Sequence, residues 1–508
     1  PNPFDTVLVA NRGEIAVRII KAVQEAGLRA IAIYSEPDKD SLHTEMANQA
    51  IYLPGDSLSE NYLNSEAIIE AAKSSGAQAI HPGYGFLSER AEFAEAVKKS
   101  GITWIGPSPE AIETMGDKIS ARSRMIESGV PVIPGDEVAI PDDSDHLGTL
   151  ASVAARVGYP LLLKASAGGG GKGMRIVREP KMLRTEYEAA AREASAAFGD
   201  GTVYVERLLT GARHIEIQIL ADKYGNCIHL NERDCSLQRR HQKVIEEAPS
   251  SAVSDELRKS MGESAVLAAK SVDYVGAGTV ELLLSSNGDF YFLEMNTRLQ
   301  VEHPVTEMIT GVDLVQKQLE IASGLPLGIS QDSVSISGHS IEARIYAEDA
   351  KIGFLPAIGK LALWRPPSGP GIRVDSGVKE GDEVTVNFDP MLAKLIVHAP
   401  SRMAAIRRLE LALSSFVALG VTTNIGFLRN ALTHPAFTSG NITTDFLDNA
   451  PMTEFISENS DPKVLVAIAS AAKRLGAGKS GVNTNSRMLD DHSGHAYDPF
   501  ITLSRRLP

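Results

Sequence analysis

A polar run between residues 294 and 303 has the residue types of a metal and anion site. It reads Glu294-Met295-Asn296-Thr297-Arg298-Leu299-Gln300-Val301-Glu302-His303. In an extended chain alternate side chains share a face, so every second residue from Glu294 to Glu302 would point to one side. Hard cations such as magnesium prefer carboxylate and amide oxygens. The spacing predicts a magnesium site of Glu294, Asn296 and the nearby Glu281, and leaves Arg298 and Glu302 for a substrate. The alternative is a solvated strand face.

Residues 168–171 are four consecutive glycines within the segment KASAGGGGKGM. Such a backbone offers bare N–H groups that can fold over nucleotide phosphates, and the neighbouring lysines supply positive charge. No Ser or Thr follows Lys172, so this is not a Walker A loop, and the next expected element is a strand, so it is not a dinucleotide-binding turn. A simple hairpin turn is the alternative.

A third candidate is the basic run RDCSLQRRHQK at residues 233–243. Arginine and lysine are the natural groups to hold anions such as bicarbonate and phosphate. A basic surface patch remains the other interpretation of this run.

Three alternations of strand, turn and helix open the chain, at TVLVANRGEIAVRIIKAVQEAGLRAIAIYS, AIIEAAKSSGAQAIHPGYGFLSE and EFAEAVKKSGITWIGPSPE. This pattern predicts a parallel sheet covered by helices, with a ligand at the carboxyl ends of its strands. The loop from His81 to Phe86 lies at such an end. A proline-rich linker at 129–141 should begin a second unit, whose strands flank the glycine run and continue through HIEIQILAD, NCIHLNERDCSLQ, GTVELLL and FYFLEMN. Short strands and the helix RMAAIRRLELALSSF follow.

Composition excludes several classes of protein. The 508 residues exceed one core and predict about three compact units. A hydrophobic content of 43% and a charged content of 22% are typical of a globular protein, and no run is long enough to span a bilayer. A net charge of −14 argues against nucleic acid as the main partner. Cys227 and Cys235 are expected to be packed free thiols rather than a disulfide or zinc site.

Seven motifs carry a resemblance to a known family. They are HPGYGFLSE, MGDK, KASAGGGGKGM, ERDCSLQRRHQK, GTVELL, EMNTRLQVEHPVTE and IEARIYAED, in that order. Together they closely resemble the biotin carboxylase component of acetyl-CoA, propionyl-CoA, methylcrotonyl-CoA and pyruvate carboxylases, over about residues 4–447. The resemblance implies an α/β protein that is α+β in its ATP-grasp part.

Four divisions follow from the resemblance and the element pattern. A Rossmann-like N-terminal domain is expected at 1–117, an ATP-grasp domain at 118–335 with a mobile lid at about 135–205, a mixed C-terminal domain at 336–447, and a poorly ordered polar tail at 448–508.

The resemblance implies a role for each motif residue, carried over position by position. Lys118 and Lys164 would hold ATP phosphates, and Gly170 and Gly171 would lie in the lid. The adenine pocket would be lined by Glu206, Arg207, Leu208 and Leu209, and the nucleotide would also lie near His214, Gln238 and His241. Glu281, Glu294 and Asn296 would bind magnesium, with manganese as an alternative ion. Bicarbonate would contact Lys243, Arg298, Gln300 and Val301, with Glu302 as the base. Biotin would meet Tyr84, Gly85 and Arg344. Ala167 and the segment 249–251 depart from the family pattern without touching a proposed catalytic group.

The implied reaction uses ATP to activate bicarbonate as carboxyphosphate and transfers the carboxyl group to a ureido nitrogen of biotin. Rival interpretations are another ATP-grasp ligase with a different nucleophile, and a nucleotide-binding regulatory module without catalysis. HPGYGFLSE and RRHQK argue against the first, and the complete set of catalytic groups argues against the second.

The implied partners are a biotin carboxyl carrier protein, a carboxyltransferase subunit and a second copy of the chain, with no nucleic acid and no membrane. The chain contains no Met-Lys-Met triplet, so biotin is expected as a carrier-bound substrate and not attached to this chain. No signal segment is evident, which predicts a cytoplasmic location, or the mitochondrial matrix or a plastid in a eukaryote. The final acyl-CoA or 2-oxo acid acceptor stays open.

Overall fold

The computed structural model describes residues 3–135, 146–165, 174–199, 201–240 and 242–456. These described residues fall within one compact unit. Among the described residues, no helix is both long and apolar enough to cross a membrane. The mixed α/β class expected from the sequence is confirmed, with one parallel sheet and several antiparallel ones.

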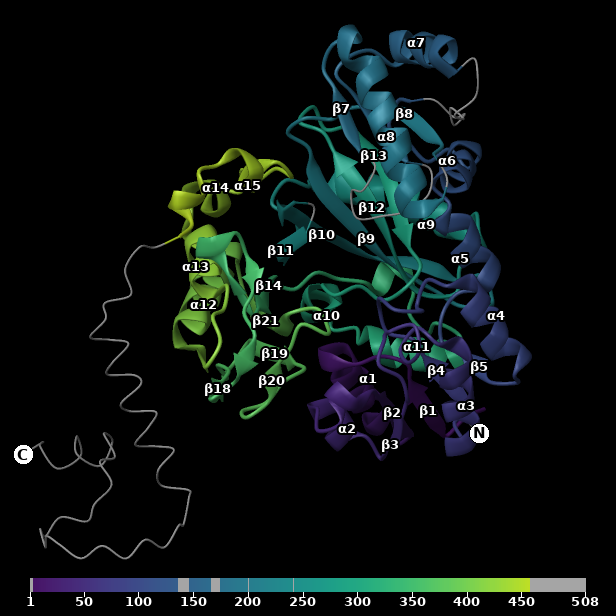
Figure 1. Ribbon diagram of the computed structural model, residues 1–508, viewed down its shortest axis with the longest axis vertical. Coiled ribbons are helices and arrows are strands. Elements are labelled where there is room, and N and C mark those ends of the chain that lie inside the picture. The colour runs from purple at the N-terminus through teal and green to yellow at the C-terminus, as the bar shows by residue number, and fades with distance from the viewer. Residues whose placement is uncertain (1–2, 136–145, 166–173, 200, 241, 457–508) are drawn as a thin grey trace, which may run out of the picture. The chain divides into compact units, whose positions relative to one another are not determined.

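A five-stranded parallel sheet in the order β3-β2-β1-β4-β5 forms the N-terminal part (Figure 1). Its strands are β1 (Thr6–Val9), β2 (Arg29–Tyr34), β3 (Gln49–Tyr52), β4 (Ala79–His81) and β5 (Thr103–Trp104). Its helices are α1 (Gly13–Glu25), α2 (Leu42–Met46), α3 (Ser65–Ser75), α4 (Ala91–Lys99) and α5 (Pro109–Gly116). Val7 and Val9 join a core cluster with α1, whereas Leu8 joins a second cluster with α3 and α4. Both faces are therefore buried, as the predicted β-α-β pattern requires.

The middle of the chain, from Arg213 to Ala399, supplies the strands of an eight-stranded antiparallel sheet in the order β13-β12-β9-β10-β11-β14-β21-β19. Its strands are β9 (Arg213–Ala221), β10 (Cys227–Arg239), β11 (Gln242–Ala248), β12 (Gly276–Leu284), β13 (Phe290–Asn296), β14 (His339–Tyr346), β19 (Ile372–Ser376) and β21 (Met391–Ala399). Strand β11 of the second expected unit pairs with β14 of the third, so the sheet continues from one unit into the other. The two expected units thus share one sheet.

A three-stranded sheet, in the order β7-β6-β8, carries the expected lid region. Its strands are β6 (Leu161–Ala165), β7 (Arg175–Val177) and β8 (Val203–Arg207). The helices of the same region are α7 (His146–Val157) and α8 (Leu183–Phe198). Strands flank the glycine run on both sides, as the sequence predicts. The run itself, with Gly170 and Gly171, lies outside the described residues.

The remaining helices cover the large sheet. They are α6 (Lys118–Glu127), α9 (Asp255–Lys270), α10 (His303–Thr310), α11 (Leu314–Ala322), α12 (Arg402–Ser415), α13 (Ile425–Thr433), α14 (Pro435–Thr438) and α15 (Phe446–Asn449). The remaining short strands are β15 (Glu348–Asp349), β16 (Leu355–Pro356), β17 (Gly359–Lys360), β18 (Leu363–Arg365), β20 (Glu383–Val384) and β22 (Val417–Leu419). Helix α9 lies on β10 and β9, whereas α12 lies on β21 and β14 (Figure 1).

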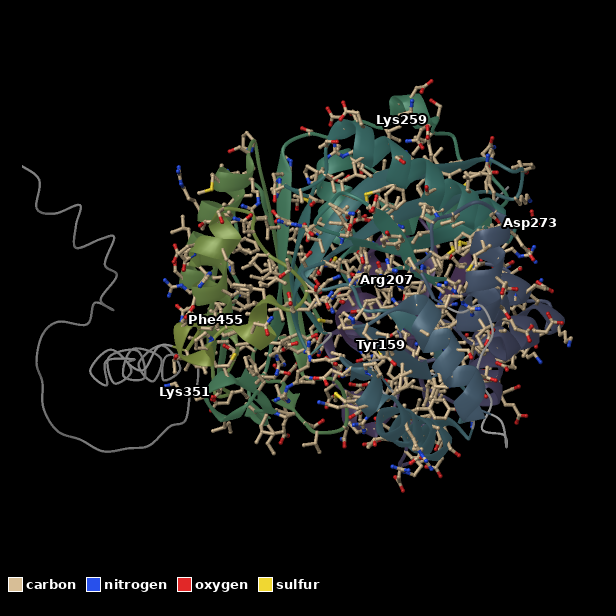
Figure 2. All side chains as sticks on the ribbon, turned by 90° about the horizontal axis from the view of Figure 1, so that it is seen from above. Tyr159, Arg207, Lys259, Asp273, Lys351 and Phe455 are labelled. Atoms are coloured by element: carbon tan, nitrogen blue, oxygen red, sulfur yellow. The ribbon has the colours of Figure 1, made fainter. Side chains whose placement is uncertain are left out.

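The chain is still packed beyond residue 448, where the sequence predicts a polar tail. Phe455, labelled in Figure 2, is fully buried. Its ring lies 6.0 Å from that of Phe427 and 5.8 Å from that of Phe446. The short apolar pair Phe455-Ile456 in a polar stretch gives no periodic pattern, so the sequence does not reveal this contact. The part of the expected tail from residue 457 onward lies outside the described residues.

Candidate active site

Three carboxylates from three different elements surround the ammonium group of Lys243 on β11. Its Nζ lies 2.6 Å from Glu216 Oε2, 2.9 Å from Glu281 Oε1 and 2.6 Å from Glu302 Oε1. Glu216 and Glu281 are direct partners across β9 and β12, so the register of the sheet puts them side by side. Burial alone would lower the pKa of Lys243, but the three carboxylates raise it well above its usual range. Lys243 is therefore a fixed positive charge in an acidic cluster.

Glu302 lies at the start of α10 and is bound by two cations. Its Oε1 accepts from Lys243, and its Oε2 accepts from Arg344 Nη2 at 3.0 Å. Burial opposes ionisation, but Lys243, Arg344 and Arg233 together lower the pKa of Glu302 well below its usual range. Glu302 is 2% exposed and ionised, so a buried carboxylate able to accept a proton stands between an ammonium and a guanidinium group.

The predicted extended run is wrong beyond Asn296. Strand β13 ends at that residue, and Glu302 is the N-cap of α10, with a turn between them. Pro304 at the second helical position favours the helix that ends the turn. The polar side chains still converge, but through a turn that places them at different depths and not along one strand face.

Arg344 on β14 is fixed by a second carboxylate, Glu246 on β11. Arg344 Nε donates to Glu246 Oε1 at 2.6 Å. Burial raises the pKa of Glu246 to about 7, although Arg344 opposes the shift. The sequence interpretation did not include Glu246 or Glu216. Strict alternation along β11 would place Glu246, three residues after Lys243, on the opposite face. The pairing of β10 and β11 is irregular at this point, so the sequence gives no signal for Glu246.

The expected magnesium ligands lie together on β12 and β13. Glu281 and Glu294 are direct cross-strand partners. Asn296 Nδ2 donates to Glu281 Oε1 at 2.8 Å, and His214 Nε2 lies 3.0 Å from Glu281 Oε2. Burial and the charge of Glu281 raise the pKa of Glu294. Two neighbouring carboxylates, the buried Glu281 and the half-buried Glu294, whose ionisation is disfavoured, fit a site that a divalent cation would stabilise.

The other residues expected at bicarbonate lie around the same cluster. Gln300 Nε2 donates to Glu281 Oε1 at 2.7 Å, and Arg298 Nη2 donates to Asn296 Oδ1 at 2.9 Å. Arg298 also pairs with Glu89, at 2.8 Å, from the HPGYGFLSE segment. The structure therefore joins two of the quoted motifs that are about 200 residues apart in the chain.

The residues expected at the nucleotide form a second polar group on β6 and β8. Lys164 Nζ donates to Glu206 Oε2 at 2.6 Å, and Arg122 Nη1 lies 3.4 Å from Glu206 Oε1. Lys118 begins α6, and burial, with the charge of Lys164, lowers its pKa against the attraction of Glu294. Lys118 is thus electrostatically coupled to both this group and the acidic cluster.

The remaining nucleotide candidates divide into three sets. Gln238 Nε2 lies 2.9 Å from His214 Nδ1, beside Glu281. Arg207 is exposed at the end of β8, and its Nη2 lies 3.4 Å from the carbonyl of Val157, in the neighbourhood of Tyr159 (Figure 2). Leu208 and Leu209 follow it directly and are half-buried. His241 lies outside the described residues.

The basic run at 233–243 is not one anion cradle. Arg233 is fully buried, and its guanidinium donates to Glu216, Gln218, Thr306, Thr279 and Gln300. Arg239 pairs with Glu348 and lies over the ring of Phe354. Arg233 and Lys243 both pair with Glu216 of the acidic cluster, and Lys243 also contacts Glu281 and Glu302. The surface-patch alternative is also wrong for Arg233, which is a structural cation.

The expected biotin loop lies at the carboxyl end of β4. Tyr84 is half-buried, and its hydroxyl donates to Glu14. Gly85 is exposed and has a φ of +67°, which favours glycine. Arg344 contributes to the electrostatic environment of Tyr84, where burial is the main cause of a raised pKa. The loop is therefore electrostatically connected to the cluster that contains Glu302.

Three family models match consecutive parts of the chain. A model described as "Biotin carboxylase, N-terminal domain" matches residues 3–112, and "Carbamoyl-phosphate synthase L chain, ATP binding domain" matches residues 117–330. "Biotin carboxylase C-terminal domain" matches residues 342–449. Together with the sheets and with Lys118 and Lys164 described above, these matches identify the chain as an ATP-grasp ligase.

Individual relatives identify the family of ATP-grasp ligases to which the chain belongs. The chain is 51% identical over 446 residues to the biotin carboxylase of Halalkalibacterium halodurans, covering 88% of this chain and 98% of that protein. It is 49% identical over 494 residues to the mitochondrial methylcrotonoyl-CoA carboxylase subunit alpha of Dictyostelium discoideum, covering 95% of this chain and 69% of that one. It spans 64% of the soybean subunit, Glycine max. The chain belongs to the biotin carboxylase family.

Solved structures agree with this membership. The biotin carboxylase domain dimer of Hydrogenobacter thermophilus 2-oxoglutarate carboxylase, in complex with MgADP, ADP and bicarbonate, superposes with a TM-score of 0.85 at 47% identity, covering 90% of this chain and 99% of that one. A biotin carboxylase from Campylobacter jejuni gives a TM-score of 0.85 at 45% identity, covering 88% and 99%.

Proposed function

We propose that this chain catalyses the ATP- and bicarbonate-dependent carboxylation of biotin carried on a separate protein, through carboxyphosphate, releasing ADP and phosphate. The observation that carries the proposal is the arrangement of Glu302 between Lys243 and Arg344, next to the Glu281–Glu294 pair. An ionised base, two fixed cations and a metal-type carboxylate pair are the groups that activation of bicarbonate by a nucleotide needs.

The chain's own residues divide the chemistry between them. Lys243 and Arg298 attract the bicarbonate anion, with Gln300 and the Val301 backbone completing its site. Glu302 accepts the bicarbonate proton at a carboxylate oxygen as the oxygen nucleophile attacks the γ-phosphate. Cleavage of the C–O bond of carboxyphosphate gives carbon dioxide and phosphate, and this phosphate takes the proton from the ureido nitrogen of biotin. Arg344 stabilises the negative charge that develops on the ureido oxygen, and the nitrogen forms its new bond to carbon dioxide.

The nucleotide groups fit the same scheme. Lys164 and Lys118 contribute positive charge for the phosphates, and Gly170 and Gly171 supply backbone N–H groups of the lid. Glu206, Arg207, Leu208 and Leu209 line the base end, with His214, Gln238 and His241 beside the nucleotide. Glu281, Glu294 and Asn296 hold magnesium, or manganese. When bound, that ion offsets negative charge on the phosphate oxygens.

The proposal extends to organisation and partners. The expected units 1–117, 118–335 and 336–447 are proposed as functional units within one compact body. A biotin carboxyl carrier protein supplies biotin, a carboxyltransferase takes the product, and the chain pairs with a second copy. A cytoplasmic or organellar matrix location is consistent with these partners.

The decisive experiment measures ATP cleavage by the purified chain with magnesium, with and without bicarbonate, and then with free biotin. We expect cleavage that requires bicarbonate and is stimulated by biotin, and a larger rate with a biotinylated carrier, because tethering raises the effective biotin concentration to about the millimolar range. Bicarbonate-dependent cleavage that ignores biotin would indicate another ATP-grasp ligase. No cleavage with intact nucleotide binding would indicate a regulatory module.

A further inference from the structure

We propose that Lys394 on β21 is a positioning residue that holds the Tyr84 loop in register with the segment carrying the base Glu302. This inference rests on the proposed function, which gives Tyr84 and Glu302 their roles. Lys394 is fully buried, and its Nζ donates to the Val301 carbonyl at 2.7 Å. The same Nζ lies 3.3 Å from Glu14 Oε2. One ammonium group therefore bridges the residue before Glu302 and the carboxylate that holds Tyr84.

The Tyr84 side of this bridge is built on the start of α1. Glu14 is 4% exposed and accepts a hydrogen bond from the Tyr84 hydroxyl through Oε1, while its Oε2 faces Lys394. Asn11 Nδ2 donates to the carbonyls of Pro82 at 2.8 Å and Tyr84 at 2.7 Å. The ANRGE segment, to which the motif comparison gave no role, thus fixes both the backbone and the ring of the biotin loop.

A histidine supports the same loop from the strand that precedes it. His81 Nδ1 accepts from the Gly83 N–H at 3.0 Å, and burial lowers the pKa of His81 to about 4, which keeps it neutral. A Cβ at Gly83 would lie 2.9 Å from Asn11 Nδ2, so the loop packs closely on its support. The loop is held firmly on α1 and β4, and its position relative to the base depends on how α1 is joined to the large sheet.

Lys394 connects α1 to the large sheet beside Glu302. Val301 immediately precedes Glu302, and Arg344, which pairs with Glu302, is the direct cross-strand partner of Lys394 on β14. Helix α1 contacts β21 and β19 (Figure 1). A shift of Lys394 would therefore displace the Val301 carbonyl and Glu14 together, and with them the base and Tyr84.

The charges around Lys394 keep it an ammonium ion. Burial alone would lower its pKa, but Glu14, Glu342 and Asp375 raise it against the opposing charge of Arg373. Glu342 has no hydrogen-bond partner at either oxygen among the described residues, and burial raises its pKa well above the usual range. Glu14, at 3.3 Å, and Asp375, at 3.9 Å, are the carboxylates within ion-pair distance of the Lys394 ammonium group among the described residues. A charge this deep is retained only where its partners are fixed.

The test compares Lys394→Met with the wild-type chain, using free biotin as the probe. Methionine keeps the volume and removes the donor. We expect the ratio of biotin-stimulated to biotin-independent ATP cleavage to fall about tenfold and KM for biotin to rise, with KM for ATP within about twofold. Lys394→Arg, which keeps donors, should recover part of the loss. Arg258→Met, which removes an ion pair to buried Glu232 elsewhere, is the control and should leave the ratio unchanged.

Glu14→Gln provides the second arm, and decides the matter if Lys394→Met does not fold. Its amide oxygen can still accept from Tyr84, but the charge facing Lys394 is gone. We expect the same fall in the ratio, and no further fall in the double variant, because both changes break one contact. An unchanged ratio in folded Lys394→Met or Glu14→Gln overturns the positioning role. A wild-type chain without bicarbonate-dependent cleavage overturns the proposed function instead.

Discussion

At the scale of single residues, burial decides which groups are charged. Glu302 and Glu246 are both buried glutamates bound by Arg344, yet the pKa of Glu302 is lowered and that of Glu246 is raised to about 7. Glu302 accepts hydrogen bonds from two cations, Lys243 and Arg344, whereas Glu246 accepts from Arg344 alone among the described residues. Two carboxyl groups that pair with the same guanidinium group thus differ in how readily they ionise. The ionised Glu302 suits base catalysis, and Glu246 suits support of Arg344.

Glu302→Gln should keep ATP binding and lose bicarbonate-dependent turnover by about a hundredfold to ten-thousandfold, the usual range for removal of a general base. Glutamine preserves the size of the side chain and can still accept from Lys243. Steady-state ATP cleavage and nucleotide titration check the two halves of this expectation. Glu263→Gln, on the exposed side of α9, is the matched control. Near-normal turnover in Glu302→Gln would remove Glu302 from the mechanism.

The pH dependence of stability should follow the buried histidines. Burial lowers the pKa of His43 to about 4, whereas the unfolded side chain titrates near 6.5. Between these values the unfolded state binds the extra proton, so stability falls as pH falls from about 6.5 towards 4. For His43 the loss between pH 6.5 and 5 is about 1.5 kcal/mol. Urea unfolding at the two pH values should show His43→Gln losing less stability than the wild type; equal losses would contradict the assignment.

At the scale of elements, one buried guanidinium connects the strands under the site. Arg233 on β10 donates to side chains of β9, β12, the 297–302 turn and α10, with Thr306 Oγ1 at 3.0 Å and Gln300 Oε1 at 2.8 Å. Because α10 begins right after Glu302, this hydrogen bonding sets the position of the proposed base relative to the sheet.

Arg233→Met should destabilise the protein by about 3–5 kcal/mol, because it leaves the buried Glu216 charge with one partner fewer. Denaturant unfolding measures the loss, and a raised KM for bicarbonate should accompany it through Gln300 and Glu302. Arg184→Met removes an exposed i,i+4 pair with Glu188 on α8 and should cost under about 0.5 kcal/mol. If Arg233→Met and Arg184→Met lose the same free energy of unfolding, Arg233 does not connect these elements.

At the scale of the whole molecule, the large sheet joins parts that family models divide. Strand β11 pairs with β14 from Ile245 to Ala248, across the boundary between the matches at 117–330 and 342–449. Leu237 and Ile245 belong to the same core cluster as Ile341 and Leu395. Glu247 on β11 also pairs with His339 and Arg402 of the C-terminal part. These parts have a common core, and neither can bury its surface alone.

Separately expressed pieces 1–335 and 336–508 should therefore fail to fold as independent domains, because the cut exposes the edge of β11 and the apolar face beneath it. Circular dichroism and limited proteolysis of each piece check this. Calorimetry of the intact chain should show a single unfolding transition for the parts that contain β11 and β14. A soluble, cooperatively unfolding C-terminal piece would contradict the shared core.

The sequence by itself determined the residue types of the site and the class of the elements. Alternation and glycine turns predicted the parallel sheet at the start of the chain, and the quoted motifs predicted Lys243, Glu281, Glu294 and Glu302, because these signals are local and survive in one dimension.

Only the tertiary structure decided how these groups are charged, supported and spaced. Strand register and contacts between residues far apart in the chain bring in Glu216, Glu246, Glu14 and Lys394. Lys394 and Val301, for example, are 93 positions apart, and Lys394 also contacts Glu14 near the start of the chain. The turn after Asn296 and the burial of Arg233 and Phe455 also depend on what packs against them. Burial and partner distance set a charge state, and neither quantity exists until distant segments meet.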